Sequence, residues 1–193
     1  MGCEREADAP LRLFSYYFLS AELLFTEQAG IRYGEETATV FYGTNCLAAA
    51  AGFFLFALLY RLLPSAGSRK HLLLALGCFG AAMTVLAPFI VALPVVALHI
   101  VTMVVIGYIG AAALYTMALS VRERARLGMF IALPYAGAFL LQYVLGLALP
   151  LFGDLSVAVH HIVLAAVLAI TVLLLLTCDV TVPAGNVRGQ DVR

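Results

Sequence analysis

Two carboxylates interrupt an apolar run near the beginning of the chain. Glu22 and Glu27 lie within residues 11–31, a stretch long enough to cross the roughly 30 Å hydrocarbon core of a bilayer. A carboxylate at the centre of a membrane helix costs about 2.5–3.5 kcal/mol on insertion scales, and such groups commonly bind protons, ions or polar solutes. At 100° per residue both carboxylates fall on one half of the helix, so we expect this half to face protein and the other to face lipid.

Other polar side chains occur at comparable depths in later apolar segments. At 1.5 Å per residue, Glu22 and Tyr108 lie near the bilayer midplane and Glu27 lies in the outer leaflet. We predict a pocket in which the two carboxylates bind a proton or a cationic group and the other polar side chains form hydrogen bonds. The predicted site comprises Glu22, Glu27, Asn45, His99, Tyr108 and Gln142.

Several of these residues also have a structural interpretation. Glu27 could be hydrated near the interface or paired with Arg32, and His99 could simply join two helices by a hydrogen bond. Small residues, including Gly43, Gly52 and the run from Gly107 to Ala113, favour close helix packing over a binding site.

The composition places these residues in a multi-pass membrane protein. The chain has 193 residues, of which 64% are hydrophobic and 11% charged, and its mean hydropathy is +1.03. Soluble domains average about 45–50% apolar and 25% charged residues, so an ordinary soluble fold is excluded. We predict an all-α fold with a polar cytoplasmic leader (1–10), a membrane domain (11–178) and a flexible cytoplasmic tail (179–193).

Hydropathy divides the membrane domain into six transmembrane helices. They are expected at about 11–31, 38–63, 72–93, 95–120, 127–150 and 156–178. The first, second, fourth and fifth carry the polar residues and are expected to line the pocket, whereas the third and sixth are expected to face lipid.

Cationic residues set the orientation of these helices. With both termini in the cytoplasm, ten of the 11 Lys and Arg residues lie inside and only Arg32 lies outside. We therefore expect a multi-pass protein of the bacterial inner (plasma) membrane, with the lipid bilayer as its first partner.

Motifs of catalysis, metal binding and nucleic-acid binding are not found. The sequence has no HExxH, no Walker A pattern, no hydrolase elbow and no metal-spaced cysteines among its four. No basic recognition helix follows Cys178. We expect no enzymatic activity, no cofactor, no metal and no nucleic-acid partner.

With six helices assigned, the arrangement resembles one half of a major facilitator superfamily transporter. In the link between the second and third helices, Gly67, Arg69 and Lys70 resemble part of the family's basic motif, whose leading Gly and Asp-Arg pair are absent here. Arg124, Arg126 and Gly128 after the fourth helix resemble a second family feature. The resemblance implies a 3+3 inverted repeat with its site facing the membrane centre.

A complete facilitator has two such halves, so the resemblance implies a homodimer, a second six-helix half as partner, or a fragment without activity of its own. The leading hypothesis is a half unit that binds or moves a small solute, coupled to protons through Glu22. The alternative is the membrane sensor module of a LuxR-type helix-turn-helix regulator that lacks its DNA-binding domain.

Overall fold

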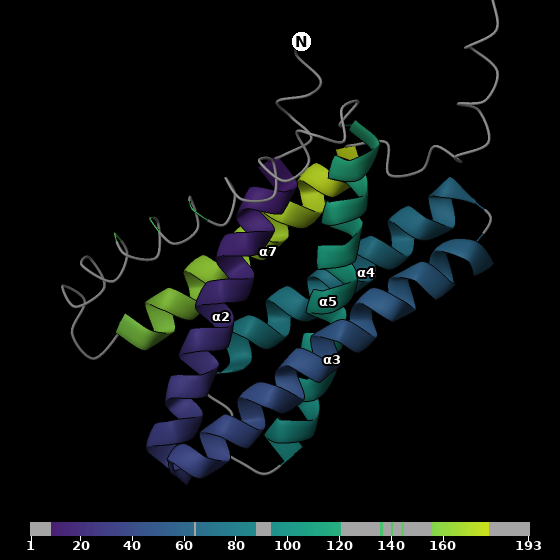
Figure 1. The fold of residues 1–193 in the computed structure, drawn as a ribbon. Helices are drawn as coiled ribbons and strands as arrows, with labels where there is room; N and C mark the ends of the chain where they lie inside the picture. The colour runs from purple at the N-terminus through teal and green to yellow at the C-terminus, as the bar shows by residue number, and fades with distance from the viewer. Residues whose placement is uncertain are drawn as a thin grey trace, which may run out of the picture.

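The described part of the protein is helical apart from the connecting residues Gly34, Leu63 and Ser65. The computed structural model describes residues 9–63, 65–87, 94–120 and 156–177, together with residues 136, 140 and 144. Within these residues five helices form the bundle in Figure 1. They are α2 (Ala9–Tyr33), α3 (Glu35–Leu62), α4 (Ala66–Leu86), α5 (Pro94–Ser120) and α7 (Ser156–Thr177).

Four of these helices are long and apolar enough to cross a membrane. The apolar stretches are Tyr42–Leu62, Ala66–Leu86, His99–Ala118 and Val157–Thr177. Each has about 20 residues, the length that matches a bilayer core. The structure therefore supports the prediction of a transmembrane protein.

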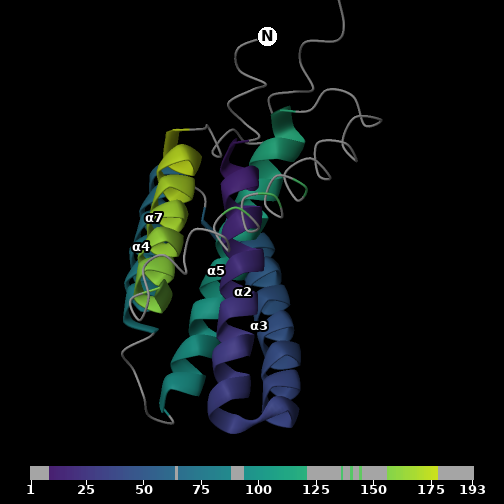
Figure 2. The same cartoon turned by 90° about the vertical axis from the view of Figure 1, so that its left-hand side faces the viewer.

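Helix α5 forms the centre of the bundle. It packs against each of the other four described helices, and 72% of its apolar stretch is buried, compared with 22% for α3 and for α4. Figure 2 shows α4 and α7 side by side on one face of the molecule and α2, α3 and α5 together on the other.

Helix α2 connects the two groups. It packs against both α3 and α7, and the Tyr17 hydroxyl lies 2.7 Å from Thr84 Oγ1 on α4. Because Thr84 donates its own hydrogen to the Gly80 carbonyl at 2.8 Å, Tyr17 must be the donor in this pair.

Successive helices alternate in direction from α2 to α5, and α7 runs the same way as α5, as the colours in Figure 1 show. The C-terminal end of α3 and the N-terminal ends of α2 and α4 therefore lie toward one end of the bundle. This end is called the basic end below.

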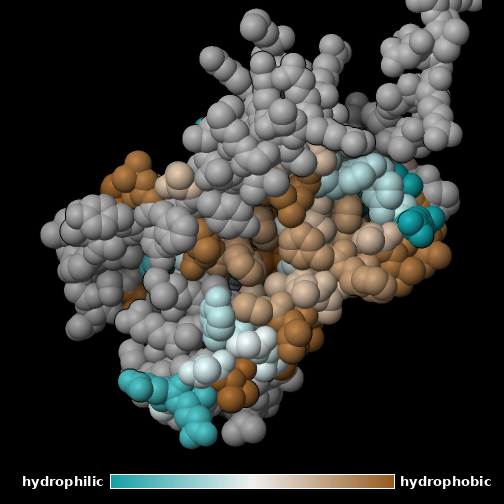
Figure 3. Space-filling model, viewed as in Figure 1, coloured by the Kyte–Doolittle hydropathy of each residue, from teal (hydrophilic) through white to brown (hydrophobic). Residues whose placement is uncertain are grey.

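Charged side chains lie at the two ends of α3. Glu35 and Glu36 occupy its first turn and Arg61 its last, an order that the helix dipole favours. Hydrophilic surface is visible at both ends of α3 in Figure 3, with apolar surface between. Four Lys and Arg side chains are described, and all four belong to the basic end: Arg12, Arg61, Arg69 and Lys70.

The third expected helix begins earlier than the sequence predicts. The expected range is 72–93, but α4 runs from Ala66 to Leu86. The Pro and Gly residues before position 72 are typical of a turn. Ser65 instead caps the helix, since its side chain accepts a hydrogen bond from Ser68 N at 3.0 Å.

The fifth expected helix, 127–150, lies almost entirely outside the described residues. Ala136, Leu140 and Val144 are described; all three are helical and exposed. The count of six helices, the 3+3 repeat and the cytoplasmic placement of the termini thus stay predictions.

Candidate functional site

Two features could bind a ligand, and they lie at different levels of the bundle. The first is a set of buried polar residues where α2, α3 and α5 pack together, here called the polar layer. Its members with described side chains are Ser20, Asn45, His99 and Thr102. The second is a recess at the basic end.

The packing of α3 on α5 sets the level of the polar layer. Gly52 lies against the backbone of Val104 and Gly107, so the two parallel helices are in contact at this point. Asn45 precedes Gly52 by seven residues and His99 precedes Gly107 by eight, so both lie about 11–12 Å below the contact. The structure therefore brings Asn45 and His99 to one level.

Both side chains are enclosed by the bundle. Asn45 is fully buried and His99 is 8% exposed. A polar group removed from water costs free energy unless it is hydrogen-bonded, so two such groups at one depth in an apolar bundle indicate either a helix-joining network or a ligand site.

The backbone of Glu22 lies near this level as well. Phe14 packs against Gly110, and Glu22 follows Phe14 by eight residues on a helix that runs opposite to α5. Glu22 therefore lies about 12 Å below Gly110, which corresponds to the level of Thr102. The side chains of Glu22 and Glu27 and the whole of Gln142 lie outside the described residues.

Tyr108 belongs to the second feature. It follows His99 by nine residues, a separation of about 13 Å along α5. The predicted set is therefore divided: Asn45 and His99 share the polar layer, while Tyr108 lines the recess.

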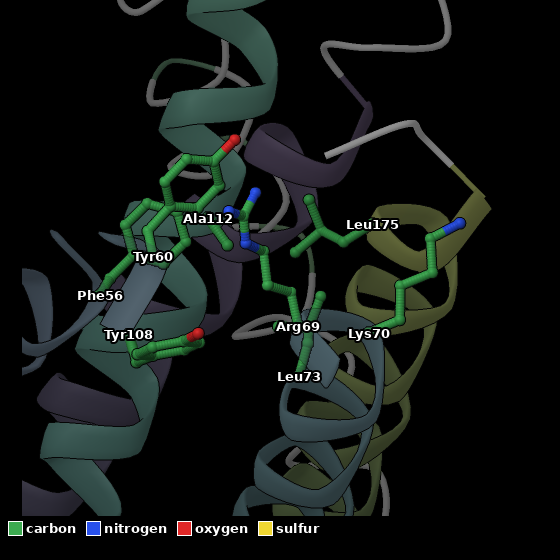
Figure 4. Close-up of a pocket in the computed structure, with 8 residues that line it drawn as sticks. All are labelled: Phe56, Tyr60, Arg69, Lys70, Leu73, Tyr108, Ala112 and Leu175. Atoms are coloured by element: carbon green, nitrogen blue, oxygen red, sulfur yellow. The ribbon is translucent and has the colours of Figure 1, made fainter. Parts of the chain in front are cut away.

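The recess, here called the basic recess, is a small hollow that is partly open to the exterior. Four helices line it, and two of them, α4 and α7, were expected to face lipid. The lining residues are Phe56, Tyr60, Arg69, Lys70, Leu73, Tyr108, Ala112 and Leu175 (Figure 4).

An aromatic cluster forms one wall of the basic recess. Phe56 meets Tyr108 edge-to-face with ring centroids 5.2 Å apart, and Tyr60 packs against Tyr115 at 4.9 Å. The Tyr115 hydroxyl also donates a hydrogen bond of 3.0 Å to the Tyr60 hydroxyl. These contacts join α3 to α5 and fix the rings in place.

Arg69 lies against this wall. Its Cζ is 3.9 Å from the centroid of the Tyr60 ring, and its Nε donates a 2.7 Å hydrogen bond to the Leu63 carbonyl. The first contact is a cation–π interaction, and the second satisfies a carbonyl beyond the last turn of α3. Figure 4 shows Arg69 extending toward the rings while the Lys70 ammonium points away from them.

Arg69 and the aromatic residues other than Tyr108 are absent from the site predicted from sequence. The positive-inside pattern is a sufficient explanation for Arg69, and an aromatic residue in an apolar helix is common. The available signal was the i, i+4 spacing of Phe56 and Tyr60 shortly before a short basic turn.

Metal ligands do not gather in the described part of the chain, where no three His, Cys, Asp or Glu side chains could hold an ion together. Comparisons with protein-family models, with curated proteins and with solved structures found no match to this chain. The resemblance to a facilitator half is therefore a prediction that depends on the sequence alone.

Proposed function

We propose that the chain is a six-helix protein of the inner membrane that binds or moves a small solute, with both termini in the cytoplasm. The observation that carries this proposal is the polar layer. Asn45 and His99 lie buried at the level of the Glu22 backbone, in a bundle whose apolar stretches can span a bilayer. Ionisable groups at such positions commonly serve ion or substrate pathways.

In this proposal Glu22 exchanges a proton during the movement of the solute. A carboxyl group in an apolar bundle is more easily accommodated when it is protonated, and a polar solute or a change of conformation can release the proton. His99 and Asn45 supply hydrogen-bond partners on the neighbouring helices.

The orientation in this proposal follows from the charges. All four described Lys and Arg side chains belong to the basic end, and the carboxylates of Glu35 and Glu36 lie at the other end of α3. The positive-inside rule then places the basic end in the cytoplasm.

Proton movement in reconstituted vesicles tests the proposal. Vesicles loaded with a pH-sensitive dye would be supplied in turn with organic anions, amines and sugars. We expect one class to move protons across the membrane with the wild-type protein, and we expect at least roughly tenfold slower movement with Glu22→Gln. The matched control is Glu36→Gln, which removes an exposed carboxylate at the end of α3.

Equal rates for Glu22→Gln and the wild type would remove Glu22 from the mechanism. Saturable solute binding without any flux would instead favour the sensor alternative, in which the membrane domain detects a ligand and another domain responds.

A further inference from the structure

The basic recess contains hydrogen-bond donors and a positive charge that the proposed solute path does not use. The Nε–H of Arg69 donates a hydrogen bond to the Leu63 carbonyl. The described residues provide no hydrogen-bond acceptor for the two terminal NH₂ groups of Arg69. The hydroxyl of Tyr108 points toward the side of the recess that Arg69 and Leu73 form, as Figure 4 shows. Arg69 and Tyr108 thus bring two donors to the lining of one recess, which favours a ligand that offers several acceptor oxygens.

The described carboxylates lie too far from Arg69 to act as its counter-ion. The described carboxylates are Glu35 and Glu36, which begin α3, whereas Arg69 lies beyond its other end. From residue 35 to residue 62 an α-helix extends about 40 Å, so these carboxylates cannot reach Arg69. An arginine at a partly buried position is well suited to bind an oxyanion such as phosphate through two parallel hydrogen bonds.

The remaining walls are apolar. Phe56, Leu73, Ala112 and Leu175 surround the donors, and the recess is a small hollow that is partly open to the exterior. A compact charged group attached to a hydrocarbon chain fits this combination better than a large polar solute does.

The rim of the recess lies at the depth of a lipid headgroup. Arg69 lies in the first turns of α4, and its hydrogen-bond partner Leu63 lies directly after α3, so this rim is at the edge of two apolar stretches, whereas Tyr108 lies deeper, within the apolar stretch of α5. Basic pockets between helices at the cytoplasmic surface attract anionic headgroups.

We propose that the basic recess binds the phosphate of an anionic phospholipid, with Arg69 and Tyr108 donating hydrogen bonds to its oxygens and Lys70 at the rim. The aromatic cluster holds the guanidinium in place, because the Tyr60 ring and the Leu63 carbonyl fix its position. This inference depends on the membrane orientation proposed above but not on the movement of any solute.

Lipid binding to the purified full chain tests this site. Phosphatidylglycerol would be titrated into the protein in a neutral detergent, and bound lipid would be counted by native mass spectrometry. We expect at least roughly tenfold weaker binding in Arg69→Gln, because the charged donor is lost. The matched control is Arg61→Gln, an exposed cation at the same end, which we expect to remain within about twofold of wild type.

A second variant covers the case in which Arg69→Gln fails to fold. Tyr108→Phe keeps the ring in the aromatic cluster and removes only the hydroxyl, so we expect an unchanged circular dichroism spectrum and about threefold weaker lipid binding. Equal losses in Arg61→Gln and Arg69→Gln would overturn the site, because they would show surface charge acting without a specific recess. Absence of phosphatidylglycerol binding to the wild type would overturn it as well.

Inorganic phosphate and phosphatidylcholine separate the sources of the oxyanion. Competition by inorganic phosphate at concentrations similar to the lipid would support the oxyanion site and assign it to a soluble phosphate. Binding of phosphatidylglycerol that neither competitor displaces would support the lipid assignment. Lipid binding through Arg69 without any movement of solute would support this site and contradict the transport proposal. Movement of solute without lipid binding through Arg69 would support the transport proposal and contradict this site.

Discussion

Two helix crossings in this bundle depend on glycine in different ways. Where α3 crosses α5, Gly52 and Gly107 lie against backbone atoms of the facing helix. Where α4 crosses α7, Gly77 and Gly80 lie against the side chains of Val172 and Leu168. Backbone cannot move without displacing a whole helix, whereas a side chain can be accommodated by smaller local shifts. The first crossing should therefore behave as one rigid unit and the second as an adjustable one.

This difference bears on both candidate sites. The polar layer lies just below the rigid crossing, so Asn45 and His99 are held at a fixed separation. The basic recess lies between the rigid pair and the adjustable pair, because its lining comes from α3 and α5 on one side and from α4 and α7 on the other. A small movement of α4 and α7 would change the recess without disturbing the polar layer.

The largest effect is expected from Gly107→Ala. A methyl group there would overlap the Ala49 backbone, with Ala49 Cα 2.9 Å away. Overpacking against groups that cannot move costs about 3 kcal/mol or more. Stability would be measured by the loss of helical circular dichroism as sodium dodecyl sulfate is added to the protein in a mild detergent.

Gly43→Ala is the control for this change, because a methyl group at Gly43 meets nothing within 4 Å. We expect it to leave the midpoint of the denaturation curve within error of wild type or slightly higher, since alanine has the better helix propensity. If Gly107→Ala proved as stable as this control, α3 and α5 would not form a rigid pair.

A smaller loss is expected from Gly77→Ala. The new methyl group would lie 2.7 and 2.8 Å from the two Val172 methyl carbons. Valine is stiff at χ1 and both its methyl groups are involved, so rotation alone does not relieve the overlap and we expect a loss of about 1–3 kcal/mol.

Val172→Ala should rescue Gly77→Ala, because it removes the two atoms that collide. A double-mutant cycle on the same denaturation curves would show a coupling free energy favouring the double variant. Additive losses in the cycle would mean that Val172 is not what limits the space at Gly77.

The sequence predicts most of the described helices to within a few residues, because hydropathy is a local property. The predicted range 95–120 and the observed α5, Pro94–Ser120, differ by a single residue. The crossings are harder to predict, because Gly43 and Gly52 look equivalent in sequence, yet Gly52 packs against α5 and Gly43 is exposed. Which glycine meets a partner depends on the rotation of each helix.

The candidate sites show the same limit. Depth along a helix follows from residue number, and residue number alone indicates a common level for Asn45 and His99. The basic recess cannot be found in this way, because Arg69 and Tyr108 are 39 positions apart and come together only through the packing of α4 against α5. The Pro and Gly residues before Arg69 also indicate a link where the structure has the first turns of α4.

The smallest effect is expected from Gly80→Ala, which tests the adjustable crossing at its least crowded point. The new methyl group would lie 3.1 Å from Leu168 Cδ2 and 3.5 Å from Val105 Cγ1. The first atom is the end of a flexible side chain, so a shift of a few tenths of an ångström suffices, and the higher helix propensity of alanine offsets part of the cost. We expect a change within about 0.5 kcal/mol, because crowding and propensity act in opposite directions. A loss of stability as large as that of Gly107→Ala, measured on the same denaturation curves, would show that α4 and α7 are as rigidly packed as α3 and α5. Movement of the basic recess relative to the polar layer would then require unpacking of the whole bundle.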